Sequence, residues 1–87
     1  MKSQLTDDFV TYFRVLPEDV RTQARKNYQL WKHNPYHPSL RFKRVHSHEP
    51  LYSVRIGRGW RALELLEGDV MTWFWIGSHA EYDRLIQ

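Results

Sequence analysis

The spacing of the apolar residues changes once along this chain of 87 residues, and that change limits the folds open to it. Up to about residue 33, apolar side chains recur every three or four positions, which is typical of amphipathic helices. From Leu40 onward they recur at every second position, which is typical of strands that bury one face. The pattern therefore predicts helices first and an antiparallel sheet after them.

The first part of the chain is expected to form two helices, over residues 6–15 and 17–33. Pro17 suits the first position of a helix, and Glu18 and Asp19 suit its positive N-terminal end. The two helices would form a helical hairpin joined by a tight corner, and the prolines that follow residue 34 would end the second one.

The remaining pattern predicts four strands and a short final helix. Leu40 begins the first strand, and Trp73 and Trp75 are expected to share one face of the last. The strands and turns are expected at residues 40–43, 52–56 (strand), 57–59 (turn), 60–67 (strand), 68–69 (turn) and 70–76 (strand), with a helical tail at 80–86. The predicted fold is α+β. An N-terminal helical hairpin packs on a four-stranded antiparallel β-sheet with a short C-terminal helix, in one domain over residues 1–87. The helices would cover one face of the sheet and leave the other for function.

Composition excludes several classes of protein. The chain has no cysteine, so it can form neither a disulfide framework nor a thiolate zinc site, and a cytoplasmic location is expected. No apolar run approaches the roughly 18 residues that cross a bilayer, so no membrane partner is expected. The polar start of the sequence does not resemble a signal peptide.

Positive charge is concentrated in the predicted sheet. Between residues 41 and 61, six Arg or Lys residues stand against the single acid Glu49, whereas residues 62–87 hold one base and five acids. The six basic residues are Arg41, Lys43, Arg44, Arg55, Arg58 and Arg61. A basic sheet on a small domain favours binding of a polyanion or an acidic partner segment. The alternative is a solvated face, partly paired with Glu64 or Glu67.

Alternation along the hairpin predicts which of these side chains meet. Arg55 points opposite to Val54 and its apolar neighbours, and Arg61 points opposite to Trp60 and Ala62. If the apolar sets face the helices, Arg55 and Arg61 stand together on the open face, with Arg41 and Lys43 on a neighbouring strand. Like charges opposed on a sheet cost stability, so folding alone gives no reason for this clustering. An arginine fork binds phosphate bidentately, which favours a bound polyanion as the reason.

His79 is the candidate for proton transfer, because it directly follows the last strand and imidazole titrates near neutral pH. A helix cap or a solvated ring is the alternative. Glu81 and Tyr82 are close enough in sequence to assist, although Tyr82 suits core packing equally well. The other histidines lack the acids or cysteines that would complete a metal site, so no metal is expected.

The element order and three segments resemble the RelE/ParE superfamily of bacterial toxins. The segments are Pro38-Ser39-Leu40-Arg41-Phe42-Lys43, Tyr52-Ser53-Val54-Arg55-Ile56-Gly57-Arg58-Gly59-Trp60-Arg61 and Trp75-Ile76-Gly77-Ser78-His79-Ala80-Glu81-Tyr82. The resemblance implies the toxin of a type II toxin–antitoxin pair, with an antitoxin, the ribosome and mRNA as partners. The members of the superfamily divide between ribosome-dependent mRNA endonucleases and proteins that poison DNA gyrase.

The same resemblance implies roles for individual residues. The catalytic residues would be Arg61, Arg55, His79 and Tyr82, and the RNA-binding residues would be Arg41, Lys43, Arg44 and Arg58. Cleavage would need no cofactor and would proceed by attack of the ribose 2′-OH on the adjacent phosphate. Ser53 departs from the lysine of some cleaving members, and the tail tyrosine is shifted. A gyrase poison, or a relative that only binds its antitoxin or nucleic acid, is the alternative.

Overall fold

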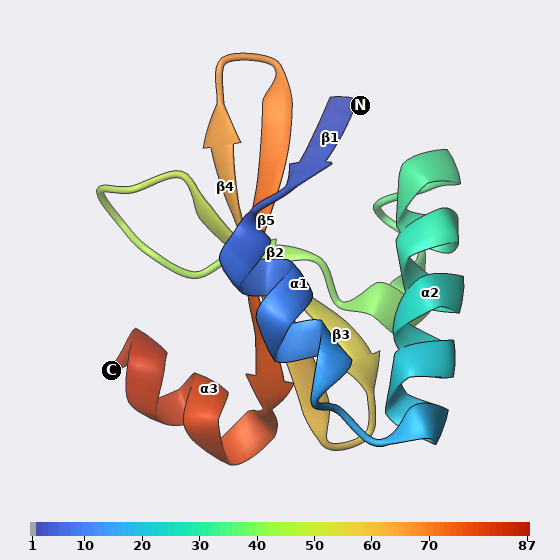
Figure 1. The fold of residues 1–87 in the computed structure, drawn as a ribbon. Helices are drawn as coiled ribbons and strands as arrows, with labels where there is room; N and C mark the ends of the chain where they lie inside the picture. The colour runs from blue at the N-terminus through green and yellow to red at the C-terminus, as the bar shows by residue number, and fades with distance from the viewer. Residues whose placement is uncertain (1) are drawn as a thin grey trace.

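One five-stranded sheet lies at the centre of the fold and carries helices on both faces (Figure 1). The computed structural model describes residues 2–87. In chain order its elements are β1 (Lys2–Leu5), α1 (Asp7–Arg14), α2 (Glu18–His33), the 3₁₀ turn η1 (Pro38–Leu40), β2 (Lys43–Arg44), β3 (Leu51–Gly57), β4 (Trp60–Glu67), β5 (Val70–Ser78) and α3 (His79–Ile86). The predicted α+β class is confirmed.

The sheet is mixed, with the strand order β1-β5-β4-β3-β2. Strands β2 to β5 pair antiparallel, whereas β1 adds a fifth strand parallel to β5. The prediction of four antiparallel strands was therefore wrong at this edge. The strand β1 is short and mostly polar, and polar contacts hold it: Ser3 Oγ lies 2.6 Å from the Tyr28 hydroxyl, and Gln4 Nε2 donates to Thr72 Oγ1 at 2.9 Å. Such a strand carries little apolar alternation to predict it from.

The two N-terminal helices lie within a residue or so of their predicted ends. Thr6 begins α1, because its Oγ1 accepts from the Phe9 amide at 3.0 Å as an N-cap. The helix α1 packs chiefly on β5, and α2 packs chiefly on β3. Together they bury the helix-side core, which consists of Phe9, Leu16, Val20, Ala24, Trp31, Leu40, Val54, Ile56, Ala62, Met71, Trp73 and Ile76.

A β-bulge in β5 separates Trp73 from Trp75. Leu63 pairs with Trp75 but the next residue, Glu64, pairs with Trp73, so Phe74 is the extra residue of the bulge. The bulge reverses the alternation, which places Trp73 in the helix-side core and Trp75 in the core on the other face. The prediction that both tryptophans share a face was therefore wrong.

The segment expected as the first strand is also different. Residues Pro38–Leu40 form a 3₁₀ turn that buries Leu40 completely, and Arg41 follows in the left-handed conformation with φ 45°. Only Lys43–Arg44 pair with β3. Proline at the start of the segment favours the turn over a ladder of hydrogen bonds, which overrides the alternating pattern.

The helix α3 covers part of the face that was expected to be open. It begins directly after β5 and forms a second, smaller core from Leu63, Trp75 and Tyr82, with Val45, Phe74 and Ile86 packed against it. We call this the α3-side core. Within residues 2–87, no helix is long and apolar enough to cross a membrane.

Candidate functional site

Arg55 and Arg61 stand directly opposite each other on β3 and β4, on the α3 side of the sheet. Their neighbours Val54, Ile56 and Ala62 are buried in the helix-side core, so the alternation predicted for this hairpin is confirmed. Like charges at directly paired positions are unfavourable unless something else offsets the repulsion.

Backbone carbonyls at the hairpin turn hold both guanidinium groups. Gly57 O accepts from Arg55 Nε at 3.4 Å and from Arg61 Nη1 at 3.3 Å, and Trp60 O accepts from Arg61 Nη1 at 2.8 Å. Gly57 has φ +147°, which side-chain-bearing residues rarely adopt, and it lies where the β3–β4 register shifts. Neutral acceptors therefore orient the two guanidiniums, whose positive charge stays available to an external anion.

The surroundings of Arg61 are electropositive. Burial lowers the pKa of Arg61 below its usual 12.5, and the charges of Arg55 and Arg41 lower it further, while Tyr82 and Asp83 act in the opposite direction. These electrostatic effects require Arg41 and Arg55 to lie near Arg61. Three arginines therefore converge on one end of the sheet. The guanidinium of Arg61 stays protonated at neutral pH despite the lowered pKa.

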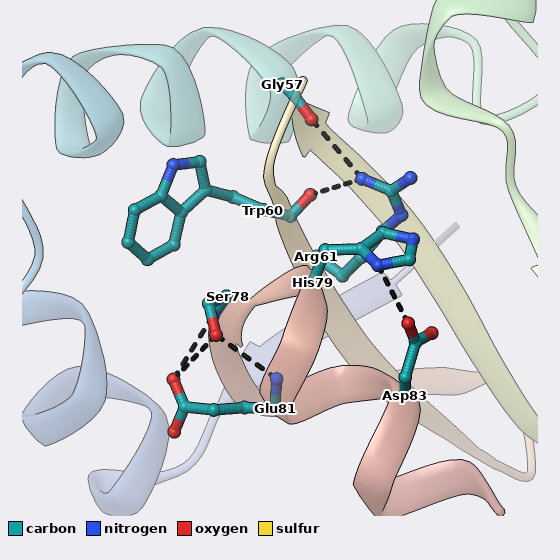
Figure 2. A network of polar contacts seen from close by, with 7 residues as sticks. All are labelled: Gly57, Trp60, Arg61, Ser78, His79, Glu81 and Asp83. Atoms are coloured by element: carbon teal, nitrogen blue, oxygen red, sulfur yellow. Dashed lines mark hydrogen bonds and ion pairs between the residues drawn. The ribbon is translucent and has the colours of Figure 1, made fainter.

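His79 is the first residue of α3 and is fixed beside this cluster (Figure 2). Its amide donates to Gly59 O at 2.8 Å, which ties it to the hairpin turn that precedes Arg61. Its Nδ1 lies 3.0 Å from Asp83 Oδ2, one helical turn further on. His79 is therefore held through its backbone amide and through Nδ1 of its ring. The other ring nitrogen, Nε2, does not contact Asp83.

The residue before His79 caps the helix. Ser78 Oγ accepts from the Glu81 amide at 3.2 Å, and the Glu81 carboxylate accepts from the Ser78 amide at 3.4 Å and from Ser78 Oγ at 3.0 Å. This reciprocal arrangement is a capping box. Glu81, which was considered for acid–base work, is therefore engaged in starting the helix.

Tyr82 reaches the same region from the α3-side core. Its ring is buried and lies 5.9 Å from the His79 ring, centroid to centroid. Because Tyr82 affects the pKa of Arg61, its phenol lies near the guanidinium. Tyr82 therefore serves core packing and also faces the arginine cluster.

Of the remaining predicted RNA-binding residues, Lys43 lies on the side of the sheet that carries the arginine cluster. It pairs with Ser53 and so shares a face with Arg55. Arg58 is exposed at the hairpin turn that precedes Arg61, where it borders a surface hollow shared with Asp19 and Gln23 of α2. It therefore lies at the arginine end of the sheet but next to the helix side.

Arg44 is placed differently from the other predicted RNA-binding residues. It pairs with Tyr52 on the helix side of the sheet. Its Nε donates to the carbonyls of His46 at 3.1 Å and Glu49 at 3.3 Å. Its guanidinium is therefore engaged in the loop between β2 and β3 and does not join the arginine cluster.

The expected acidic partners of the basic face are elsewhere. Glu64 faces the helix-side core, fully buried, and neither of its carboxylate oxygens has a hydrogen-bond partner. Glu67 accepts from Thr72 Oγ1 at 2.9 Å. The suggestion that these acids neutralise the arginines was wrong for Glu64, because its position in β4 alternates with that of Arg61.

Two of the histidines outside this cluster stabilise local turns. His37 Nδ1 accepts from the Ser39 amide at 3.2 Å, and His46 Nδ1 accepts from the amides of His48 at 3.1 Å and Glu49 at 2.9 Å. Among the described residues, no three His, Cys, Asp or Glu side chains are grouped so as to hold a metal ion.

Three residues near the site were not singled out from the sequence. Asp83 was detectable, because it follows His79 at the i,i+4 spacing of a helical pair. Asn27 donates from Nδ2 to Arg55 O at 2.9 Å, and Gly77 lies against the Trp75 indole next to Arg61. The last two depend on contacts between segments that are distant in sequence, so no local pattern indicates them.

A separate apolar groove lies between α1 and α2 on the other side of the sheet. It has a volume of about 210 Å³. It is lined by Leu5, Phe9, Val10, Phe13, Ala24, Arg25, Tyr28, Ile56, Trp73 and Ile76. The Arg25 guanidinium lies 5.1 Å from the centre of the Phe13 ring, so a cation–π contact joins the two helices across the groove.

Solved structures with this fold come from several organisms. The chain is similar to a chain of the RelB–RelE antitoxin–toxin complex from Methanococcus jannaschii, with a TM-score of 0.75, 13% identity and coverage of 95% of this chain and 98% of that one. It is similar to YafQ from Escherichia coli (TM-score 0.74, 10% identity, 93% and 96% covered). It is also similar to a YoeB/ParE toxin from Agrobacterium tumefaciens (TM-score 0.71, 13% identity, 91% and 99% covered).

Sequence comparison identifies the family. No curated protein matches the chain. The family model described as the ParE-like toxin domain matches residues 18–84, which include the arginine cluster, His79 and Asp83. The chain therefore belongs to the ParE-like toxin family, within the RelE/ParE superfamily.

Proposed function

We propose that this protein is the toxin of a type II toxin–antitoxin pair and cleaves mRNA on the ribosome. The observation that carries the proposal is the convergence of Arg41, Arg55 and Arg61 beside an imidazole whose Nδ1 is already held. Three cations at one end of the sheet, two of them held by backbone carbonyls, suit a phosphate diester. A fixed imidazole next to them suits the proton transfer that cleavage of such a diester requires.

The proposed reaction is attack of the ribose 2′-OH on the adjacent phosphate. It yields a 2′,3′-cyclic phosphate and a new 5′-OH end. Arg61 and Arg55 would stabilise the charge that grows on the phosphorane, and loss of such a donor typically costs about 10²–10³ in rate. His79 would move a proton through Nε2, a contribution of roughly 10²–10⁴. The Tyr82 phenol, near Arg61, would hydrogen-bond the same phosphate.

The exposed cations around the cluster would hold the RNA backbone. Arg41, Lys43 and Arg58 lie on the same end or face of the sheet as Arg61 and would contact phosphates, which carry no sequence information. Sequence preference would then come from the ribosomal site. Arg44 would instead stabilise the loop between β2 and β3, because its Nε is engaged by two carbonyls there.

The proposed partner in the resting cell is an antitoxin. A RelB–RelE complex is among the structures of similar fold. An acidic or amphipathic antitoxin segment that folds on binding would cover the basic face and the helical pair, where the apolar groove between α1 and α2 offers buried contact area.

The test is controlled expression in a bacterial host of the wild type, Arg61→Ala and His79→Ala, with transcriptome-wide mapping of 5′-OH ends. We expect growth arrest and new 5′-OH ends inside translated codons for the wild type, and loss of both for the two variants. Lys26→Ala, which removes an exposed cation from α2, is the matched control and should behave as the wild type. Circular dichroism must show that each variant is folded.

Two other outcomes would replace the proposal. Arrest without new RNA ends, unaffected by His79→Ala, would favour a poison of DNA gyrase or of another target. That candidate is favoured by the match to the ParE-like family model. A folded wild-type protein that neither arrests growth nor cleaves RNA would be a binding protein on the toxin fold.

A further inference from the structure

The contact between His79 and Asp83 contributes little to the stability of the fold, because both side chains are partly exposed to solvent. Their side chains are 46% and 51% exposed, and exposed i,i+4 ion pairs add little to the stability of a helix. The capping box of Ser78 and Glu81 already starts α3 without help from this pair. The contact between Nδ1 and the carboxylate therefore has its main consequence in the chemistry of the imidazole.

That consequence concerns the position of the ring proton. A carboxylate only accepts hydrogen bonds, so Asp83 Oδ2 at 3.0 Å requires the proton of neutral His79 to be on Nδ1. The lone pair is then on Nε2, the nitrogen on the far side of the ring from Asp83. A histidine without such a partner distributes its proton between both nitrogens, and the orientation of its ring is not fixed.

The pair also lies within the arginine cluster. Asp83 acts electrostatically on Arg61, opposite in sign to Arg55 and Arg41. Figure 2 shows the His79 ring with one edge toward Asp83 and with the Arg61 guanidinium drawn beside it. Asp83 is thus the acidic side chain that acts both on the imidazole and on the electropositive end of the sheet.

We propose that Asp83 is a positioning residue, which holds His79 as its Nδ1–H tautomer and so presents Nε2 to the 2′-OH of the RNA. This inference rests on the proposed function for its role in cleavage, although the tautomer itself is a property of the free protein. Asp83 touches neither substrate nor phosphate. It acts through His79 alone, in the manner of the carboxylate that orients histidine in hydrolytic triads.

The first experiment needs no RNA. The tautomer of His79 is read from the side-chain ¹⁵N shifts of the full-length protein by long-range ¹H–¹⁵N correlation, above the pH at which imidazole is protonated. We expect the Nδ1–H form to predominate in the wild type and in Asp83→Glu. In Asp83→Leu we expect the Nε2–H form to increase severalfold. Asp69→Asn removes the same charge from the β4–β5 turn and should leave the His79 signals unchanged. A wild type that is mainly the Nε2–H form, or an Asp83→Leu variant with wild-type shifts, would overturn the proposal.

The second experiment measures cleavage of mRNA on purified ribosomes. For Asp83→Leu we expect kcat to fall roughly tenfold to a hundredfold, less than for a buried triad carboxylate because the pair is half exposed. KM should be unchanged or lower, because removing an acid near the arginines favours RNA binding. Asp83→Glu should restore most of kcat. A rise in KM with unchanged kcat would contradict a positioning role. Absence of cleavage by the wild type would overturn the proposed function, and the tautomer experiment would still decide whether Asp83 orients His79.

Discussion

At the scale of single residues, Gly77 shows how the site depends on the absence of a side chain. A Cβ built on Gly77 would lie 2.5 Å and 2.8 Å from two carbons of the Trp75 indole, which is much closer than carbon atoms can approach. The indole lies against the strand backbone where Gly77 pairs with Arg61. The packing of the α3-side core and the placement of Arg61 therefore meet at one position.

Gly77→Ala is expected to lower the free energy of unfolding by about 1–3 kcal/mol, because the Trp75 ring must move out of a packed core. Chemical denaturation measures this change. Gly59→Ala is the matched control, since a Cβ at Gly59 would have no atom within 4 Å and its φ is ordinary, so it should change stability by less than about 0.5 kcal/mol. Equal effects of the two substitutions would contradict the steric argument.

Glu64 is a buried acid in the helix-side core. Burial raises the pKa of its carboxyl from 4.5 to about 9, so the group is protonated at neutral pH in the folded protein. The indole N–H groups of Trp31 and Trp73 are also buried without acceptors in this core, so the region holds donors and an acceptor that do not meet. Unpaired buried polar groups of this kind cost stability.

The direction of the pH effect follows from the raised pKa. The unfolded chain releases the proton of Glu64 near pH 4.5 and the folded one near pH 9, so the contribution of Glu64 to stability is largest below pH 4.5 and is lost as the pH rises toward 9. At pH 7 the loss is of the order of 3 kcal/mol. Glu64→Leu should remove this component and flatten the pH dependence of urea unfolding between about pH 5 and 8. Glu49→Gln removes an exposed acid and should leave the pH dependence unchanged. If the Glu64→Leu profile ran parallel to that of the wild type, the buried carboxyl would be ionised in the folded protein.

At the scale of secondary structure, the buried side-chain amide of Asn27 joins α2 to the β3–β4 hairpin. Asn27 Nδ2 donates to Arg55 O at 2.9 Å, and Asn27 Oδ1 accepts from Gln23 Nε2 at 2.7 Å. The strand β3 is fixed to the helix at Arg55, directly before the bulge that lies between Arg55 and Gly57. The helix therefore limits how far the two guanidiniums can shift.

Asn27→Leu is expected to cost about 1–3 kcal/mol in stability, because it leaves the Arg55 carbonyl without its donor. It should also increase hydrogen exchange of the amides around the hairpin turn, and lower cleavage by more than the loss of folded protein explains. Hydrogen-exchange mass spectrometry and cleavage assays below the unfolding temperature separate these effects. Gln29→Leu, at an exposed position of the same helix, is the control. Unaltered exchange at the turn would mean that β3 does not need this bond.

The elements also show what the sequence could and could not predict. Regular alternation in β3 and β4 was enough to place Arg55 beside Arg61, because each residue of a strand faces opposite to its neighbour. The same reasoning failed in β5, where one bulge at Phe74 reverses the faces, and at Leu40, where proline starts a 3₁₀ turn. The strand β1 was missed because its partner lies about 68 residues away and its side chains are mostly polar. Long-range register and isolated bulges leave no local signal.

At the scale of the whole molecule, positive charge is denser at one end of the sheet than at the other. The arginine cluster and Lys43 occupy one face and end of the sheet, whereas Asp69 and Glu67 lie at the β4–β5 turn, which is the opposite end of β5 from His79. Such a separation gives an anionic ligand a preferred orientation before it makes contact. The acids would repel RNA from the turn, so productive encounters would occur at the His79 end.

Binding of single-stranded RNA to the purified protein should therefore depend on salt through the cations of this face alone. Each phosphate contact to a single strand contributes about 0.7 to the slope of log Kd against log salt concentration. Arg55→Gln and Lys43→Gln should each reduce that slope by about this amount. Lys26→Gln, which removes an exposed charge from α2, should lower neither the slope nor the affinity beyond the small effect of net charge. Fluorescence anisotropy with a short labelled RNA, titrated at several salt concentrations, measures all four slopes. If Lys26→Gln reduced the slope as much as Lys43→Gln, RNA would be binding to the basic surface as a whole, and the sheet face would have no special part in it.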